Sequence, residues 1–174
     1  MKRHASVLIA VVLAGAGSVI GWAATNQAPL AARQPAADPL VGQWDLNVGR
    51  THYGGGAEPR TKESFDCTAT GAAVTCSIHS VMADGRSVVA GFTATYDGPA
   101  GPTHGIPDAD HVKLARVSAS IADATFTSQG KPVFGYRVVR SENGRSLTIV
   151  SVDPTSRAVL NSVVLYDQRP ARGR

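Results

Sequence analysis

The sequence predicts an all-β protein in which one domain forms an antiparallel up-and-down β-barrel of about eight or nine strands. Three observations predict this fold. Short stretches of alternating apolar and polar residues recur at a spacing of about 8–12 residues. Turn signals such as Asp84-Gly85 and Asn143-Gly144 separate these stretches, and no segment carries the apolar stripe of an amphipathic helix. Because short turns join successive strands, a meander that closes on itself is the simplest arrangement.

The strands are expected where the alternation is sustained. The clearest is 87–96, in which Val88, Ala90, Phe92 and Ala94 alternate with other residues. Two long segments, 49–60 and 97–110, are rich in Gly and Pro and are expected to be loops. The nine expected strands are 41–48, 61–70, 73–82, 87–96, 111–117, 122–128, 133–140, 146–152 and 158–168.

The N-terminal segment has the parts of a secretory signal peptide. Lys2 and Arg3 supply a basic start, an uncharged apolar run follows, and Gly21-Trp22-Ala23 fits the small-x-small rule for cleavage. We expect residues 1–23 to be removed on export, which leaves no stable membrane span and places the protein in the periplasm or outside the cell. An uncleaved anchor is the alternative, because about 20 uncharged residues are just enough to span a bilayer.

The remainder of the chain divides by composition. Residues 24–38 are rich in Ala, Pro and Gln and predict a flexible linker, because they cannot build a core. The barrel domain is expected over 39–169, and residues 170–174 form a short tail.

The charge of the chain gives no indication of a nucleic-acid partner. The full chain has 17 basic and 13 acidic side chains, and loss of Lys2 and Arg3 with the signal peptide leaves 15 against 13. Nucleic-acid binding requires a basic face, and the sequence has no basic run and no aromatic residue interleaved with Lys or Arg. We therefore expect no nucleic-acid partner.

The two cysteines, Cys67 and Cys76, are predicted to form a disulfide. If Gly71-Ala72 is the centre of a tight turn, the two flanking strands pair so that Cys67 lies opposite Cys76, with β-carbons close enough to bridge. An oxidising compartment permits the bond. Two buried free thiols are the alternative. A metal site is disfavoured, because no histidine has ligand spacing to them.

Two sets of residues resemble known families. Gly42-Gln43-Trp44 resembles the Gly-x-Trp motif of the lipocalins. Tyr96-Asp97-Gly98, followed by the stretch 105–110 (Gly-Ile-Pro-Asp-Ala-Asp) and two closing hairpins, resembles a family of small secreted bacterial proteins described as lipocalin-like. The resemblance covers about residues 39–168 and implies a barrel. It implies no particular activity, and Thr95-Tyr96-Asp97 does not reproduce the Thr-Asp-Tyr motif of true lipocalins.

Trp44 is expected to plug the closed end of the barrel as a core residue, since large aromatic side chains dominate core energetics. The resemblance implies an arginine over that ring. Arg169 is the candidate for this position, and a solvated tail arginine is the alternative reading of the same residue.

The barrel interior has two possible contents. A barrel of about eight strands holds one small ligand or fills with side chains. Phe92, Tyr96, Tyr136 and Tyr166 are the aromatic candidates for lining a cavity. The many Ala, Val and Ser residues at inward positions fit either an open cavity or a narrow packed barrel.

The entrance to a cavity is expected opposite Trp44. Counting strand directions from Trp44 places the loop 49–60 at the mouth, and Gly54-Gly55-Gly56 makes that loop the candidate lid. The candidate ligand-binding residues are therefore His52, Tyr53, Phe92 and Tyr136. The same count places the loop 97–110 and Gly130-Lys131 at the closed end and Asn143-Gly144 at the mouth.

Motifs for metal binding or catalysis are weak. His104, Asp108, Asp110 and His111 are the only local cluster of metal-capable groups. Their spacing matches no established site and is typical of a turn. No Gly-x-Ser-x-Gly is present, and Glu occurs only at 58, 63 and 142, without an evident carboxylate pair. We expect no metal and no cofactor, and an enzyme is less expected than a non-catalytic protein.

Three functional hypotheses follow, in order of preference. The first is an exported binding protein that holds a small, largely apolar ligand in the barrel. The second is a structural or interaction protein with a filled barrel that acts through its surface. The third is an enzyme that uses the barrel mouth.

Overall fold

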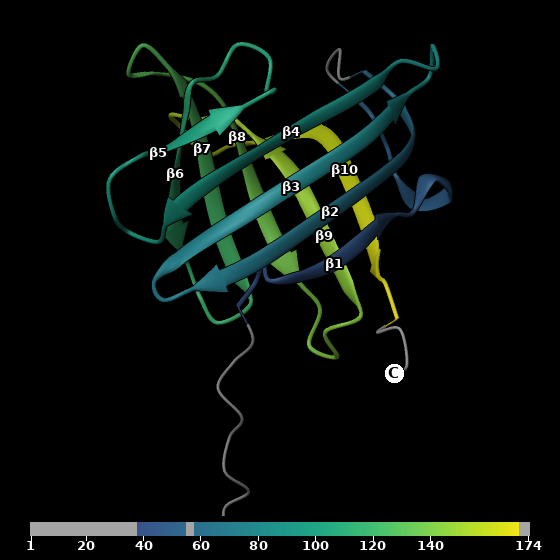
Figure 1. Ribbon diagram of the computed structural model, residues 1–174, viewed down its shortest axis with the longest axis horizontal. Coiled ribbons are helices and arrows are strands. Elements are labelled where there is room, and N and C mark those ends of the chain that lie inside the picture. The colour runs from purple at the N-terminus through teal and green to yellow at the C-terminus, as the bar shows by residue number, and fades with distance from the viewer. Residues whose placement is uncertain (1–37, 55–57, 171–174) are drawn as a thin grey trace, which may run out of the picture. The chain divides into compact units, whose positions relative to one another are not determined.

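The protein folds as a closed antiparallel β-barrel in which consecutive strands are neighbours (Figure 1). The computed structural model describes residues 38–54 and 58–170. The expected signal peptide, the expected linker up to residue 37 and the expected tail from residue 171 lie outside the described residues. The ten strands are β1 (Gly42–Leu46), β2 (Arg60–Thr70), β3 (Ala73–Met82), β4 (Ser87–Thr95), β5 (Gly101–His104), β6 (His111–Arg116), β7 (Ile121–Ser128), β8 (Lys131–Arg140), β9 (Ser146–Val152) and β10 (Val159–Gln168).

β1 closes the barrel by pairing on both of its edges. Trp44 lies opposite Phe65 of β2 on one edge and opposite Gln168 of β10 on the other. Closure removes the free edges that an open sheet would present. After Leu46 the chain leaves the sheet in a short 3-10 helix, η1 (Val48–Arg50), so the first strand is shorter than the expected 41–48.

The all-β meander and the nine expected strands are confirmed, and β5 is the tenth strand, which the sequence did not indicate. β5 has four residues, including Pro102, and shows no alternation of apolar and polar residues. It pairs with β4 through Gly91 opposite His104 and Phe92 opposite Thr103. A Cβ atom at Gly101 would lie 1.9 Å from the Thr93 carbonyl oxygen, so only glycine permits this close approach.

The extra strand reverses the direction of every later strand relative to the expected count. The assignment of residues 97–100 to the Trp44 end is confirmed, but the assignment of the later turns and loops to barrel ends is wrong from β5 onward. The segment 105–110 and Gly130-Lys131 lie at the mouth, together with Asp84-Gly85, whereas Asn143-Gly144 lies at the Trp44 end. Figure 1 shows the turn between β8 and β9 below the barrel, at the same end as the last residues of β10.

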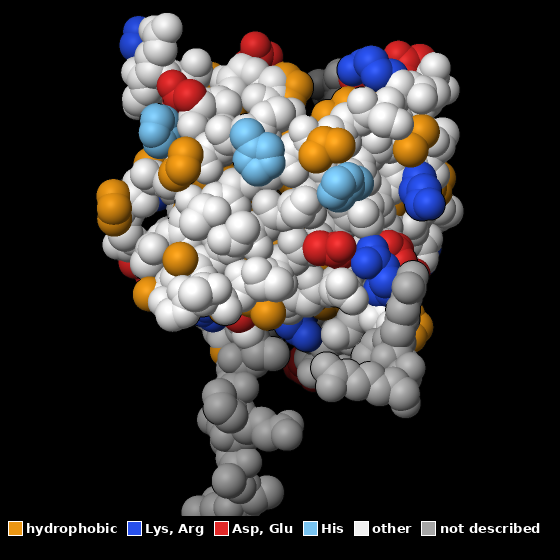
Figure 2. Space-filling view, in the orientation of Figure 1, with side chains coloured by type: hydrophobic (Ala, Val, Ile, Leu, Met, Phe, Trp, Pro, Cys, Tyr) orange, Lys and Arg blue, Asp and Glu red, His pale blue; other side chains and the backbone are white. Residues whose placement is uncertain are grey.

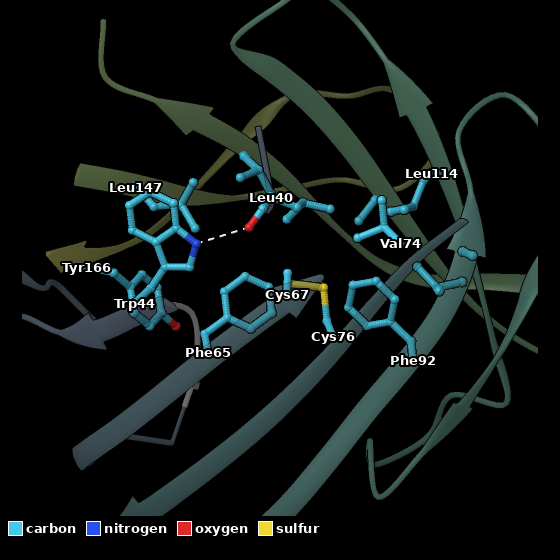
Figure 3. Packing of buried hydrophobic residues seen from close by; sticks show 14 of the residues in the cluster. Leu40, Trp44, Phe65, Cys67, Val74, Cys76, Phe92, Leu114, Leu147 and Tyr166 are labelled. Carbon is cyan, nitrogen blue, oxygen red and sulfur yellow. Dashed lines mark hydrogen bonds between the residues drawn. A yellow bond between two sulfur atoms is a disulfide. The ribbon is translucent and has the colours of Figure 1, made fainter. Parts of the chain in front are cut away.

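The Trp44 end of the barrel is packed with side chains, and we call it the base. Trp44 is fully buried, and its indole Nε1 donates to the Leu40 carbonyl at 3.0 Å (Figure 3). Leu114 and Leu147 are also fully buried here. The core role expected for Trp44 is confirmed.

The disulfide between Cys67 and Cys76 is present, and it crosslinks β2 to β3 beside the base (Figure 3). The register runs as the turn at Gly71 predicts, with Thr70 opposite Ala73 and Cys67 opposite Cys76. Gly71 has φ of +61°, a backbone conformation that favours glycine. Both cysteines are buried, so the crosslink is part of the core.

The arginine over Trp44 is Arg140, not Arg169. The Arg140 guanidinium carbon lies 5.0 Å from the Trp44 ring centroid, and Nη1 donates to the carbonyls of Asp38 and Val41. Arg169 instead pairs with Asp45 on the outer face of the barrel, with 2.6 Å between Nη2 and Oδ1. Both expected placements of Arg169, over the ring or free in solvent, are therefore wrong.

Candidate functional site

A cavity of about 500 Å³ lies inside the barrel between the base and the mouth. It extends from Leu40 at the base to Glu58 and Arg86, whose side chains are 53% and 54% exposed, so it reaches solvent at the mouth. Small inward residues such as Ala90, Ala124 and Ser162 leave this space empty.

Aromatic side chains from β4, β7 and β8 form one wall of the cavity. The Phe126 ring lies at the centre of this wall. Its centroid is 4.8 Å from that of Phe134 in a stacked arrangement, 6.2 Å from that of Phe92 and 5.9 Å from that of Tyr136, the last two edge-on. Such geometries stabilise aromatic clusters beyond their buried area. The wall is therefore a preformed apolar surface.

The side of the cavity formed by β2, β3 and β10 carries a buried carboxylate, Glu63, which is 4% exposed. Its Oε1 accepts hydrogen bonds from the Arg60 guanidinium, at 3.0 Å, and from the Tyr166 hydroxyl. Its Oε2 accepts from the Ser80 hydroxyl. Three donors from two neighbouring strands and from β10 thus satisfy this carboxylate, as burial of a charge requires.

Arg60 links the buried carboxylate to the open part of the cavity. Its side chain is 25% exposed, and its guanidinium carbon lies 5.8 Å from the ring centroid of Tyr53. The Tyr53 hydroxyl is buried and has no hydrogen-bond partner among the described residues. Burial is the largest single effect and acts to lower the pKa of Arg60, but Glu63 and the neighbouring tyrosines together outweigh it. The net pKa is raised, so Arg60 keeps its charge.

Three tyrosines on the cavity are held in their neutral form. Burial is the largest cause that raises the pKa of Tyr53, Tyr136 and Tyr166, and for Tyr166 the neighbouring Glu63 carboxylate raises it further. Near pH 7 each phenol therefore keeps its proton and acts as a hydrogen-bond donor.

The mouth is shaped by the segment after β5. Gly105, Ile106, Pro107 and Asp108 all line the cavity. The segment is held in place by the Thr103 hydroxyl, which donates to the Ala109 carbonyl at 2.7 Å. The sequence-based count places this stretch at the closed end, and that prediction is wrong because β5 reverses the direction of the chain before it.

Three of the four candidate ligand-binding residues line the cavity: Tyr53, Phe92 and Tyr136. His52 is exposed and is not among the lining residues. Its backbone bridges Val163, which has the outward register on β10 between the lining residues Ser162 and Val164. Their part in ligand binding stays a prediction. Of the candidate lid, Gly54 packs against the Asn161 backbone, and Gly55 and Gly56 lie outside the described residues.

Tyr96 and Tyr166 were also candidates for lining the cavity, and only one of them does so. Tyr166 lines the cavity. Tyr96 lies outside it, where its hydroxyl donates to Asp38 at 2.8 Å and the Arg116 guanidinium carbon lies 4.2 Å from its ring centroid.

The Arg60–Glu63 pair is a feature of the cavity that was not predicted from the sequence. The signal available was the period of two along β2: Glu63, Phe65 and Cys67 share one face, and that face is the inner one. A carboxylate on the same face as two inward apolar residues is expected to be buried, and a buried charge needs hydrogen-bonding partners. Arg60 had no such signal, because a register shift between Arg60 and Lys62 interrupts the alternation.

The cluster considered for a metal does not assemble. Within residues 38–54 and 58–170, no group of three His, Cys, Asp or Glu side chains has metal-binding geometry. His111 contacts Asp110 at 3.0 Å, whereas the His104 ring lies against Gly91 on the outer surface. Figure 2 shows the histidine side chains of this face lying apart from one another.

No family model, curated protein or solved structure matches the chain. None of the described helices is long and apolar enough to cross a membrane.

Proposed function

We propose that the protein is an exported binding protein that holds one small, largely apolar ligand inside the barrel. The observation that carries the proposal is the cavity of about 500 Å³ with an aromatic wall and a few polar groups. Small-molecule sites are usually preformed, largely apolar and about 300–1,000 Å³ in volume. The cavity matches this description in size and in lining.

The compartment belongs to the same proposal. A disulfide is compatible with an oxidising compartment, where such bonds persist. We propose the periplasm or the extracellular space, and membership of the lipocalin-like family of small secreted bacterial proteins, on the signal-peptide pattern of residues 1–23 and the Gly42-Gln43-Trp44 motif.

The alternative of a filled barrel is less well supported. Filling would require large inward side chains along the upper parts of β3, β4 and β7, where Ser80, Ala90 and Ala124 occur instead. Protein interiors are close-packed, and an unfilled space of this size is uncommon unless it has a use.

A catalytic use of the cavity has one supporting feature, the buried Arg60–Glu63 pair. A general base needs a free lone pair directed at the substrate. Glu63 already accepts hydrogen bonds from Arg60, Ser80 and Tyr166. Such a carboxylate is better placed to hold its neighbours in position than to accept a proton, so binding is the function we propose.

Native mass spectrometry after gentle purification tests the proposal. We expect a bound small molecule, released on mild collisional activation, or binding of an added apolar probe at a ratio of one per chain. An Ala90→Leu variant, which adds bulk within the cavity, should lose the adduct while keeping its circular dichroism spectrum. A wild-type protein that retains no molecule and binds no apolar probe would overturn the proposal.

A further inference from the structure

The free polar groups that face the cavity are predominantly donors. Arg60 has five N–H groups, and the hydrogen bonds of the described residues use only one nitrogen, Nη1. Tyr53 and Tyr136 add neutral phenols, and the Tyr53 hydroxyl is buried without a partner among the described residues. Arginine carries no acceptor, so a ligand gains most by presenting an acceptor oxygen to this side of the cavity.

The one buried acceptor with a charge is already occupied. Glu63 accepts hydrogen bonds from Arg60, Tyr166 and Ser80 and uses both of its oxygens to do so. A ligand that presents a donor would have to displace one of these neighbours, which would leave a buried donor unpaired at considerable cost.

The charges of the cavity leave no positive charge free for an anion. Arg60 is balanced by Glu63 at 3.0 Å, and Arg86 at the mouth is balanced by Glu58 at 2.6 Å. Asp108 is the remaining lining residue with a charged side chain, and it is acidic. A carboxylate entering the cavity would lose its hydration and meet a site whose formal charge is already negative.

We infer that Glu63 is a built-in counter-ion of Arg60 that makes the cavity select an uncharged ligand bearing an acceptor oxygen, such as an ester, ketone or amide, over a carboxylate of the same skeleton. This inference rests on the proposed binding function. In it, Arg60 and Tyr53 hold the acceptor oxygen, and the wall around Phe126 holds the apolar part. Glu63 is a specificity-determining residue that acts through Arg60.

Three probes of one skeleton test this inference: methyl 2-naphthoate, 2-naphthoate and 2-methylnaphthalene, titrated calorimetrically at pH 7.5. In the wild-type protein we expect the ester to bind at least about tenfold more tightly than the carboxylate, and more tightly than the hydrocarbon. A carboxylate that binds as tightly as the ester would overturn the inference. This ranking uses the wild-type chain alone, so it does not depend on the folding of a variant.

The Glu63→Gln variant identifies the residue responsible. The amide keeps the shape of the carboxylate and removes its charge, so the preference for ester over carboxylate should fall by about tenfold or reverse. Glu142→Gln, the same change at an exposed position in the β8–β9 hairpin at the base, is the matched control and should keep the wild-type ratio.

The outcomes separate the two claims. If the three probes bind but Glu63→Gln, shown to be folded by its melting curve, leaves the ester-to-carboxylate ratio unchanged, the role of Glu63 is wrong while the binding function stands. If none of the probes binds the wild-type protein, the proposed function fails for this class of ligand, and the inference fails with it.

Discussion

The base and the upper half of the barrel are built from the same strands and differ in what their inner faces carry. At the base, Trp44, Leu114 and Leu147 fill the interior, and each is fully buried. In the upper half, small residues on the same inward register leave a cavity of about 500 Å³. β4 contains both situations: Ala94 belongs to the packed core, whereas Ala90 lines the cavity.

This difference indicates that the two parts of the barrel have different roles. The base contains the buried Trp44, a disulfide, and Arg140, which donates hydrogen bonds to two backbone carbonyls. The upper half carries the partly buried Tyr53 and Tyr136 and a buried ion pair, whose desolvation offsets much of its attraction. We therefore expect stability to be concentrated at the base and the proposed binding function to reside in the upper half.

The largest expected effect is at the base. Trp44→Ala should lower the free energy of unfolding by about 3–5 kcal/mol, because a large aromatic side chain is removed from a packed interior. Phe134→Ala, on the cavity wall, should cost clearly less, because Phe134 is only partly buried and already faces empty space. Denaturant unfolding of both variants checks this. A Trp44→Ala cost below about 1 kcal/mol would contradict a packed base.

Loss of the disulfide is the next effect in size. The Cys67→Ala/Cys76→Ala variant should lose about 2–3 kcal/mol, since the bond closes a short loop and its entropic gain is modest. The measurement is denaturant unfolding compared with that of the wild type, after mass mapping of unreduced wild-type peptides. Two free thiols in the unreduced wild-type protein would refute the crosslink.

The alanines of β4 sharpen the comparison within a single strand. Ala94→Leu should destabilise the fold by about 1–3 kcal/mol, because it overpacks the base. Ala90→Leu should change stability by less than that, because its side chain enters the cavity. Thermal unfolding of the two variants and of the wild type measures the two losses of stability. Equal destabilisation would mean that the upper half is packed as tightly as the base.

Local sequence signals predicted the parts of the barrel that depend on neighbouring strands. The turn at Gly71 set the register that places Cys67 opposite Cys76, because a hairpin fixes its own pairing. β5 left no such signal, because it has only four residues and is ordered by close contact with β4. One missed strand then inverted the placement of every later loop, including the segment 105–110.

The candidate site was predictable only where a residue follows the alternation of its own strand. Phe92 and Tyr136 follow the alternation of their strands, and both line the cavity. His52 does not line the cavity, because its place is set by pairing with Val163, a contact between segments 111 residues apart in the chain. The Arg60–Glu63 cluster also depends on Tyr166 from β10, so no local pattern contains it.

The smallest expected effect lies on the outer surface. Burial acts to raise the pKa of Asp123, but Arg137 at 2.9 Å and Arg157 at 2.9 Å outweigh it and the net pKa is lowered. The resulting stability is present above the unfolded-state pKa of about 4 and is lost as the pH falls below it. Asp123→Asn should therefore flatten the loss of unfolding free energy between about pH 4 and pH 2. An unchanged acid profile would show that this cluster contributes nothing.

The central claim is that the upper half of the barrel is a ligand site and the base is not. Amide NMR during titration with methyl 2-naphthoate tests it most directly. We predict chemical-shift changes concentrated around Ala90, Ile106 and Phe126, with the amides near Leu114 and Leu147 unchanged. Changes confined to the base or to the outer face of the barrel would contradict the account.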